Sequence, residues 1–447
     1  MKVLKFGGTS VGSAQRFKHV ATLICDGNQN MVVLSAMSGT TNSLVEIAHC
    51  LYQKDFAGAN DIIDHLTGKY AGVIEELYST QEYREKAQAL IQSHWDGIRS
   101  FVNDRFTHIE ERIILAQGEL ISTGMMNLYL LETGVNVALL PALEYMQTDK
   151  NSEPDTVYIK EKLLALMEKN PDATLYITQG YICLNANGEI DNLQRGGSDY
   201  TASLIGAALA SEEIQIWTDI DGMHNNDPRI VENTSPVRNL SFQEAAELAY
   251  FGAKILHPTC IQPAKEHNIP VRLLNTMQPE APGTTISNEL VKDTIKAVAA
   301  KENIISIKIK SSRMLLATGF LRKVFEIFEN YHTPIDMVTT SEVGISVTID
   351  NPKHLDKIVA NLKKYGEVTV DHDMVIVCVV GDFEWDNIGF EANIVNALKK
   401  IPVRMISYGG SNFNVSLLIK SSDKIRALQA LSKHLFNVPA TNHPHPN

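Results

Sequence analysis

Two glycine-containing segments carry charged side chains that could transfer a phosphoryl group. KFGGTSVGS begins with Lys5, and RGGSD begins with Arg195 and ends with Asp199. Glycine pairs before a helix-like segment are typical of a loop that lets phosphate approach a helix N-terminus. Asp199 would repel phosphate unless a cation neutralises it, so we predict that Lys5 pairs with Asp199 at the transfer point. For the first segment alone, a tight turn with a solvated lysine is an equally good interpretation.

RGGSD also carries side chains that could bind a substrate. The planar guanidinium of Arg195 could bind a substrate carboxylate through two hydrogen bonds, which lysine could not do. Ser198 and Asp199 could instead cap the helical segment YTASLIGAALA that follows. Capping explains the serine and the aspartate but not the adjacent Arg-Gly-Gly, so the pattern favours a functional loop.

Several other segments carry single candidates for which an ordinary structural interpretation is stronger when each is taken alone. Glu119 begins an apolar helical segment, where the helix dipole favours a glutamate, although its carboxylate could bind a substrate ammonium. Thr41 lies in the turn SGTTN at the end of a strand. The polar segment WTDIDGMHNNDPR also follows a strand, and open α/β sheets bind ligands at that end of their strands. The candidates there and beyond are Thr218, Asp219, Arg229 and Lys254.

The elements that would position these residues follow a βαβ pattern at the N-terminus. VLKF is the first strand, residues 14–24 form a helix, and a second strand begins at Met31, which predicts a mostly parallel sheet. Residues 55–107 are predicted to form helices packed beside it. Further strands are predicted at NVALLP, TLYITQGYI, IQIWTDI and IPVRLLN. Together they predict an α/β layered domain over residues 1–290.

Beyond the segment NTMQPEAPGTTISN, short strands and helices alternate. The order β-α-β-β-α-β runs from ISIKIKS to EVTVDHD, and MVIVCVVG begins the same order again. Pro334 and Pro402 occupy matching places between a helix and a strand. This repetition predicts two ferredoxin-like modules, over residues 291–374 and 375–447.

Composition and charge exclude several classes of protein. The net charge is −12 and no basic stripe is present, so we expect binding neither to nucleic acid nor to an acidic membrane surface. The 5 cysteines are scattered without a CxxC pair, which predicts reduced thiols and no zinc site. The N-terminus turns glycine-rich too early for a signal peptide, and no apolar segment reaches the roughly 18 residues of a membrane span. We therefore expect a cytoplasmic protein.

In combination and in this order, KFGGTSVGS, SGTTN, QGELIS, RGGSDYTA, WTDIDG with NDPR, and FGAKILHP resemble the signature segments of the aspartokinases (aspartate kinases). SRMLLATGFLRKVFEIF, IDMVTTSE and VRMISYGGSNFNVSLL resemble the paired ACT regulatory modules of that family, most closely those of its monofunctional, lysine-sensitive branch. The resemblance covers nearly the whole chain. It implies an amino-acid kinase fold, in which helices sandwich a mostly parallel sheet, followed by two ACT modules.

The resemblance implies that the chain uses ATP to phosphorylate the β-carboxylate of L-aspartate to 4-phospho-L-aspartate, the first step of lysine, threonine and methionine biosynthesis. Because that carboxylate is ionised at pH 7, no general base is needed, and catalysis consists of positioning and charge neutralisation. Mg²⁺ would arrive on ATP, held mainly by phosphates and water, and we expect no dedicated metal site in the protein. The alternatives are a kinase of another amino-acid carboxylate and an inactive amino-acid-binding regulatory protein.

The resemblance also implies roles for single residues. Lys5 would stabilise the γ-phosphoryl group and Asp199 would position Lys5, while Arg195 would bind the α-carboxylate of aspartate and Glu119 its ammonium. Two hydroxyl side chains that would bind the substrate are Thr41 and Ser198. The implied ATP-binding residues are Lys5, Gly7, Gly8, Thr218, Asp219, His224, Arg229, Lys254 and Ile255. His224 stands where the family often has tyrosine, a departure that bears on packing at the adenine side.

The ACT modules imply feedback control by an amino acid, with lysine as the first expectation and threonine as the second. We expect no fused homoserine dehydrogenase domain, which the threonine-sensitive relatives carry. Five residues resemble the effector loops: Met314, Asp336, Thr340, Ser341 and Glu342. Asp336 and Glu342 could bind a cationic amine, although solvated turn carboxylates are the ordinary interpretation. Because ACT modules of this family dimerise, a homodimer or larger homo-oligomer is expected.

Overall fold

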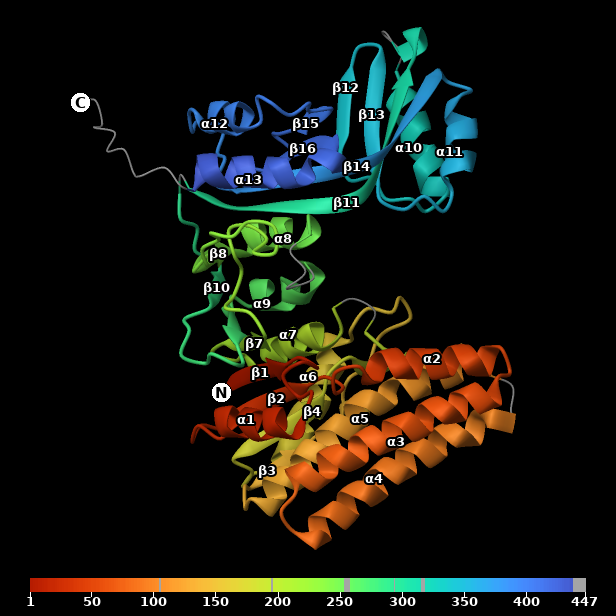
Figure 1. The fold of residues 1–447 in the computed structure, drawn as a ribbon, viewed down its shortest axis with the longest axis vertical. Coiled ribbons are helices and arrows are strands. Elements are labelled where there is room, and N and C mark those ends of the chain that lie inside the picture. Colours follow the sequence, from red (N-terminus) through yellow and green to blue (C-terminus); the bar gives the residue numbers. More distant parts are fainter. Residues whose placement is uncertain (104–105, 194–195, 253–257, 293, 315–317, 437–447) are drawn as a thin grey trace, which may run out of the picture. The chain divides into compact units, whose positions relative to one another are not determined.

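The computed structural model describes residues 1–447 except 104–105, 194–195, 253–257, 293, 315–317 and 437–447. The chain divides into two units, one formed by Met1–Met223 with Leu256–Asn288 and the other by His224–Ile255 with Glu289–Asn447. Each unit has its own large sheet, labelled in Figure 1.

The first unit is built on a mostly parallel sheet. The strands that the first unit contributes to this sheet are β3 (Val137–Leu139), β4 (Leu175–Gln179), β2 (Asn30–Leu34), β1 (Lys2–Phe6), β7 (Ile214–Thr218), β9 (Val271–Asn275) and β10 (Thr284–Ser287), named in spatial order. Neighbours from β3 to β9 pair in parallel, and β10 pairs antiparallel with β9. Strands β2 and β4 are buried along their whole length, as expected for a sheet covered on both faces. The predicted parallel sheet is therefore confirmed.

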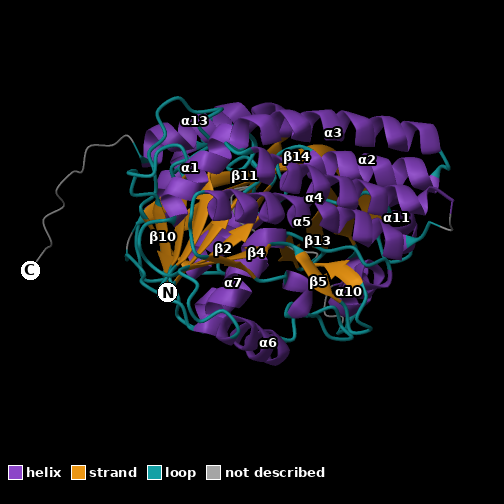
Figure 2. Ribbon diagram, turned by 90° about the horizontal axis from the view of Figure 1, so that it is seen from below, coloured by secondary structure: helices purple, strands orange, loops and turns teal. Residues whose placement is uncertain are grey.

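Helices cover this sheet, and four long ones pack together at its side. The helices are α1 (Ala14–Ile24), α2 (Thr40–Tyr52), α3 (Phe56–Leu77), α4 (Gln81–Arg99), α5 (His108–Glu132), α6 (Thr156–Glu168), α7 (Gly197–Leu209) and the short α9 (Gln262–Glu266). Figures 1 and 2 show α2, α3, α4 and α5 side by side. Asp55, Thr80 and Thr107 each accept a backbone hydrogen bond at the start of α3, α4 and α5, which defines where these helices begin. The helical segment predicted over residues 55–107 is confirmed, and α1 has its predicted bounds.

The second unit contains an antiparallel sheet with two helical layers. Its strands, in spatial order, are β12 (Val338–Ser341), β13 (Gly344–Ile349), β11 (Ile295–Lys310), β14 (Glu367–Gly381), β16 (Asn414–Lys420) and β15 (Met405–Ser407). One core packs α10 (Phe320–Asn330) and α11 (Leu355–Leu362) on the sheet, and the other packs α12 (Phe390–Ala397) and α13 (Lys424–Leu435). Residues 224–255, with β8 (Asn239–Ser241) and α8 (Phe242–Tyr250), belong to this unit as well.

The two ferredoxin-like modules predicted above share strands, which the sequence did not predict. Strand β14 runs without a break through the predicted boundary at 374–375, with only a local irregularity at Asp373, whose φ is 56°. The first half of β11, residues 295–301, pairs with the second half of β14. It supplies the closing strand that the second repeat lacks in the sequence. The modules are therefore interleaved, unlike the contiguous ranges 291–374 and 375–447 predicted above.

The division of the chain also differs from the predicted catalytic domain of residues 1–290. Residues 224–255 pack with the antiparallel sheet: Asn225 O accepts a hydrogen bond from Val298 N at 2.9 Å, and Asn226 donates to Leu428 O at 3.1 Å. Each of these hydrogen bonds joins residues that are more than 70 positions apart in the sequence. No local sequence pattern could therefore predict them. Among the described residues, no helix is long and apolar enough to cross a membrane.

Candidate active site

Five parallel strands of the first unit end at one edge of the sheet, and short polar connections follow them. β1 leads into Gly7, β2 into Ser35, β4 into Gly180, β7 into Asp219 and β9 into Thr276. The carboxyl ends of parallel strands are where open α/β sheets bind ligands. The site is built from these connections and from the start of α7.

Lys5 and Asp199 form the predicted pair at this edge. The Lys5 Nζ lies 2.7 Å from Asp199 Oδ1, and the two side chains are only 11% and 17% exposed. Lys5 is on the central strand β1, and Asp199 is in the first turn of α7. Shielding from solvent strengthens such a pair relative to one on the surface. The predicted contact is confirmed, while its role in phosphoryl transfer stays a prediction.

Gly7 and Gly8 leave space for close approach around the lysine. A Cβ at Gly7 would lie 3.5 Å from Lys5 Nζ, and one at Gly8 would lie 2.7 Å from the Ala36 carbonyl oxygen. Gly8 O also accepts a hydrogen bond from Ser38 N at 3.1 Å. The loop after β1 therefore packs directly on the loop after β2, and a larger residue at Gly8 would separate them.

The RGGSD segment places Asp199 through its glycines. Gly196 is the N-cap of α7 with φ of 70°, Gly197 has φ of 48°, and no side chain caps this helix. Instead Ser198 Oγ accepts a hydrogen bond from Ser35 Oγ at 2.9 Å. The capping interpretation of Ser198 and Asp199 is therefore wrong, because their side chains contact other strand ends. Arg195 lies outside the described residues.

Glu119 is buried in the middle of α5, and not in a first turn as its sequence pattern suggested. Its side chain accepts a hydrogen bond from Ala36 N at 3.2 Å through Oε1, while Oε2 is buried and receives none from the described residues. Burial raises the pKa of Glu119 to about 7, although the hydrogen bond from Ala36 and the charge of Lys5 oppose this shift. A buried carboxylate oxygen without a donor is suited to bind an ammonium.

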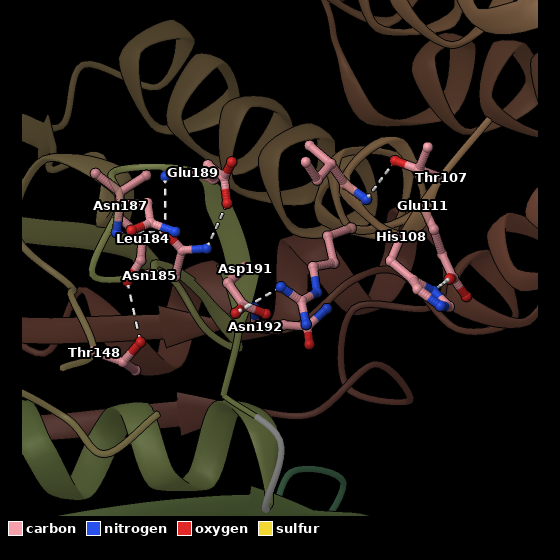
Figure 3. Close-up of polar contacts among 12 residues, drawn as sticks. Thr107, His108, Glu111, Thr148, Leu184, Asn185, Asn187, Glu189, Asp191 and Asn192 are labelled. Carbon is pink, nitrogen blue, oxygen red and sulfur yellow. Dashed lines mark hydrogen bonds and ion pairs between the residues drawn. The ribbon is translucent and has the colours of Figure 1, made fainter. Parts of the chain in front are cut away.

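A small hairpin connects β4 to RGGSD and is anchored to α5. It consists of β5 (Ile182–Leu184) and β6 (Ile190–Asn192), and its turn is closed by Asn185 and Glu189, whose side chains are hydrogen-bonded at 2.9 Å. Arg112 of α5 forms an ion pair of 3.0 Å with Asp191, which is labelled in Figure 3 and lies just before the loop. The sequence analysis did not identify this anchor, because Arg112 and Asp191 are far apart in the chain.

Thr276 is a second positioning residue that the sequence analysis missed. Its hydroxyl lies 2.7 Å from Ser10 Oγ in the loop after β1, and its N–H donates to Thr218 O at 2.8 Å. Its carbonyl oxygen lies 2.6 Å from His19 Nε2 in α1. The buried residue therefore fixes the glycine loop to the end of β7. A threonine directly after a strand is the only signal in the sequence, and it is a weak one.

The remaining predicted substrate and nucleotide residues are distributed over both units. Thr41 is exposed in the first turn of α2, and Thr218 ends β7 with Asp219 exposed beside it. His224 and Arg229 belong to the second unit. His224 Nδ1 lies 2.8 Å from Thr234 Oγ1. Lys254 and Ile255 lie outside the described residues.

Arg229 already uses its guanidinium within the chain. Its side chain is 79% exposed and donates two hydrogen bonds to Asp227, of 2.9 and 2.8 Å. These bonds hold the pKa of Asp227 below its usual value. A phosphate group that binds Arg229 would therefore compete with Asp227.

The predicted effector residues divide into two sets. The side chain of Asp336 is 2% exposed and lies just before β12. Thr340, Ser341 and Glu342 are exposed at the far end of the same strand, next to the turn into β13, and Met314 is half-buried. An extended chain rises about 3.3 Å per residue, so Asp336 and Glu342 are separated by about 20 Å. One small molecule bound to a single chain cannot contact both carboxylates.

Comparisons with known proteins show which family the chain belongs to. The model of the amino acid kinase family matches residues 1–275, and an ACT domain model matches residues 377–435. Aspartokinase 3, chloroplastic, of Arabidopsis thaliana is 35% identical over 97% of this chain and 81% of its own length. The lysine-sensitive aspartokinase 3 of Escherichia coli (strain K12) is 30% identical over 97% of this chain and 99% of its own.

A solved structure has the same fold as this chain, and the two match over nearly their full lengths. E. coli aspartokinase III in complex with aspartate and ADP (R-state) superposes with a TM-score of 0.84 at 30% identity, covering 98% of this chain and 100% of that one. The fold and the ion pair at the sheet edge thus define a member of the amino acid kinase family. Within that family, the chain belongs to the aspartokinases.

Proposed function

We propose that this chain transfers the γ-phosphoryl group of ATP to the β-carboxylate of L-aspartate, giving 4-phospho-L-aspartate and ADP. The observation that carries the proposal is the shielded Lys5–Asp199 pair at the carboxyl edge of a parallel sheet, together with the buried carboxylate of Glu119. The likeness to an aspartokinase solved with aspartate and ADP supports the same substrates.

The proposed reaction needs charge neutralisation more than proton transfer. The β-carboxylate attacks the γ-phosphorus while the bond from that phosphorus to the β,γ-bridging oxygen breaks, and no proton has to move. Lys5 would lie beside the transferring group, and Asp199 would keep its ammonium in place. Glu119 would bind the substrate ammonium and Arg195 the α-carboxylate, so that the β-carboxylate points toward ATP.

Mg²⁺ is part of this proposal as a partner of the nucleotide. Among the described residues, no group of three or more His, Cys, Asp or Glu could hold a metal ion. In this proposal Mg²⁺ is bound mainly by the phosphates and by water, as is usual for this ion. The ion would neutralise phosphate charge alongside Lys5.

We further propose that lysine inhibits the enzyme through the ACT modules and that the chain forms homo-oligomers. Lysine is favoured over threonine because the E. coli relative is lysine-sensitive and matches over almost its full length. Buried Asp336 in the first module would provide a carboxylate for a cationic amine.

The test is an acyl-phosphate trap. The full chain is incubated with MgATP, L-aspartate and hydroxylamine, and the hydroxamate formed is measured. L-Glutamate, N-acetylglutamate and carbamate replace aspartate in parallel reactions. We expect hydroxamate with aspartate and a decrease on adding lysine, with threonine as the comparison. Product with another acceptor but not with aspartate would contradict the proposed substrate.

A further inference from the structure

A cluster of four side chains includes the predicted effector carboxylate of Asp336 and a lysine of the same chain that contacts it. Lys301 Nζ on β11 lies 2.5 Å from Asp336 Oδ1 and 3.0 Å from Asp350 Oδ2. The Tyr250 hydroxyl, at the end of α8, donates to the same Asp336 Oδ1 at 2.7 Å, and Lys301 Nζ lies 4.4 Å from the centre of the tyrosine ring. All four residues belong to the second unit.

This cluster carries one more negative charge than positive. It holds the carboxylates of Asp336 and Asp350 against the ammonium of Lys301. Asp336 Oδ2 is buried, and none of the described residues donates a hydrogen bond to it. A buried carboxylate oxygen is normally satisfied, so an orphaned one beside excess negative charge points to a cationic ligand.

An ammonium that binds Asp336 Oδ2 would lie close to that of Lys301. Like charges this close repel strongly in a shielded site. Lys301 would keep a partner on leaving Asp336, because it already contacts Asp350, whose side chain is 40% exposed. Lys301 can therefore form an ion pair with either of two carboxylates, that of Asp336 or that of Asp350.

The same contacts hold the end of α8. Tyr250 is the last residue of that helix, and Gly252 follows it with φ of 113°. A Cβ at Gly252 would overlap the carbonyl oxygen of Ala300, the residue before Lys301 on β11.

We propose that Lys301 acts as an internal counter-cation of the effector site and that Tyr250 couples this site to the end of α8. In the effector-free chain, Lys301 and Tyr250 both bind Asp336 and hold α8 against β11. A cationic amino acid at Asp336 moves Lys301 toward Asp350 and weakens the Tyr250 hydrogen bond. The end of α8 then shifts. This inference depends on the proposed function for the effector.

The test measures L-lysine binding by calorimetry and amide hydrogen exchange of residues 242–250. It uses the full chain and the variants Lys301→Met and Tyr250→Phe. Lys310→Met is the matched control, because Lys310 is exposed at the end of the same strand. We expect Lys301→Met to bind lysine about 5- to 150-fold more tightly, the range of ordinary coupling between sites. We expect Lys310→Met to bind it like the wild type.

Tyr250→Phe removes only the hydroxyl and keeps the charge balance, so it tests the coupling even if Lys301→Met folds poorly. We expect it to bind lysine more tightly than the wild type, because the hydrogen bond that lysine weakens is already absent, and to show fast exchange at the end of α8 with or without lysine. In the wild type, lysine should increase that exchange. Unchanged lysine affinity in Lys301→Met, no binding to either protein, or exchange in α8 that ignores lysine would overturn the inference. The hydroxamate assay without lysine is independent of these readouts, so a failed kinase assignment would be seen separately.

Discussion

The ammonium of Lys5 lies against the carboxylate of Asp199, and both side chains are largely shielded from water. The pair is electrically neutral as a whole. An incoming phosphate therefore meets an ammonium that is already oriented, without a large uncompensated charge beside it. Lys5 therefore provides position as much as charge.

Replacing Lys5 by alanine should strongly reduce turnover. We expect kcat to fall by about 10²–10³-fold, the usual cost of losing one preorganised donor to the transition state. Steady-state kinetics with aspartate and MgATP would measure it. Lys2→Ala is the control, since Lys2 is on the same strand but 40% exposed and 3.9 Å from Glu213. A Lys5→Ala enzyme with wild-type kcat would remove Lys5 from the reaction.

Glu119 should make aspartate binding depend on pH near neutrality. Its carboxyl has a pKa raised to about 7, so it is largely ionised above that pH and protonated below it. Only the ionised form attracts the substrate ammonium, and the ionised fraction falls about tenfold for each pH unit below the pKa. We therefore expect KM for aspartate to rise as pH falls from 8 to 6, while KM for ATP changes little.

Glu119→Gln provides the matched comparison for that profile. Loss of one charged hydrogen bond costs about 1.5–3 kcal/mol, so KM for aspartate should rise by about 10- to 100-fold. Because glutamine does not titrate, its KM should no longer change between pH 8 and 6. A variant that keeps the wild-type pH profile would show that another group is responsible.

At the scale of single elements, the start of α7 must lie very close to the end of β4. Gly180 makes this possible, since a Cβ there would lie 2.8 Å from Ser198 Cα and would overlap the Ser198 side chain. Ser198 and Asp199 are consecutive on α7, so moving one moves the other. The distance between Lys5 and Asp199 thus depends on the glycine that follows β4.

Gly180→Ala should therefore impair catalysis more than stability. A displacement of about 1 Å in a reacting group can cost about 10²-fold in rate, and we expect kcat to fall on that scale. Gly68→Ala is the control, because nothing lies within 4 Å of its added Cβ in α3, and it should leave kcat unchanged. Equal kcat for the two variants would contradict the proposed role of this close approach.

Sequence patterns predicted the elements whose signals are local. Glycine turns and apolar periodicity predicted helix α1, the end of the strand that carries Lys5 and the turn before Asp199. The position of Glu119 in α5 was missed, although Thr107 and Glu110 form a capping box whose T-x-x-E pattern marks the helix start. Ser35 and Thr276 were missed for a different reason: their partners come from other strands, and only the folded sheet brings them together.

At the scale of the whole molecule, the chain is interleaved in a way that no local pattern reveals. Strands β11 and β14 each serve both regulatory modules, and pairing between strands of distant sequence is set by the fold. Residues 224–255, which carry the predicted ATP residues His224 and Arg229, pack with these modules. Residues 224–255 therefore group with the second unit, although the amino acid kinase family model extends over residues 1–275.

A chain cut at residue 290 should consequently be unstable in the segment 224–255. Ile230 and Val231 pack against the core of the second module, and the buried face of α8 includes Phe242 and Leu248. Exposing a large apolar side chain costs about 1.5–3 kcal/mol, and each kcal/mol lowers Tm by about 2–4 °C in a unit of this size. With several such side chains exposed, we expect Tm to fall by about 10 °C or more relative to the full chain. Limited proteolysis should cut within residues 224–255 of the truncated chain but not of the intact one. If both chains unfold at the same temperature and resist the protease equally, residues 224–255 do not depend on the regulatory sheet for their structure.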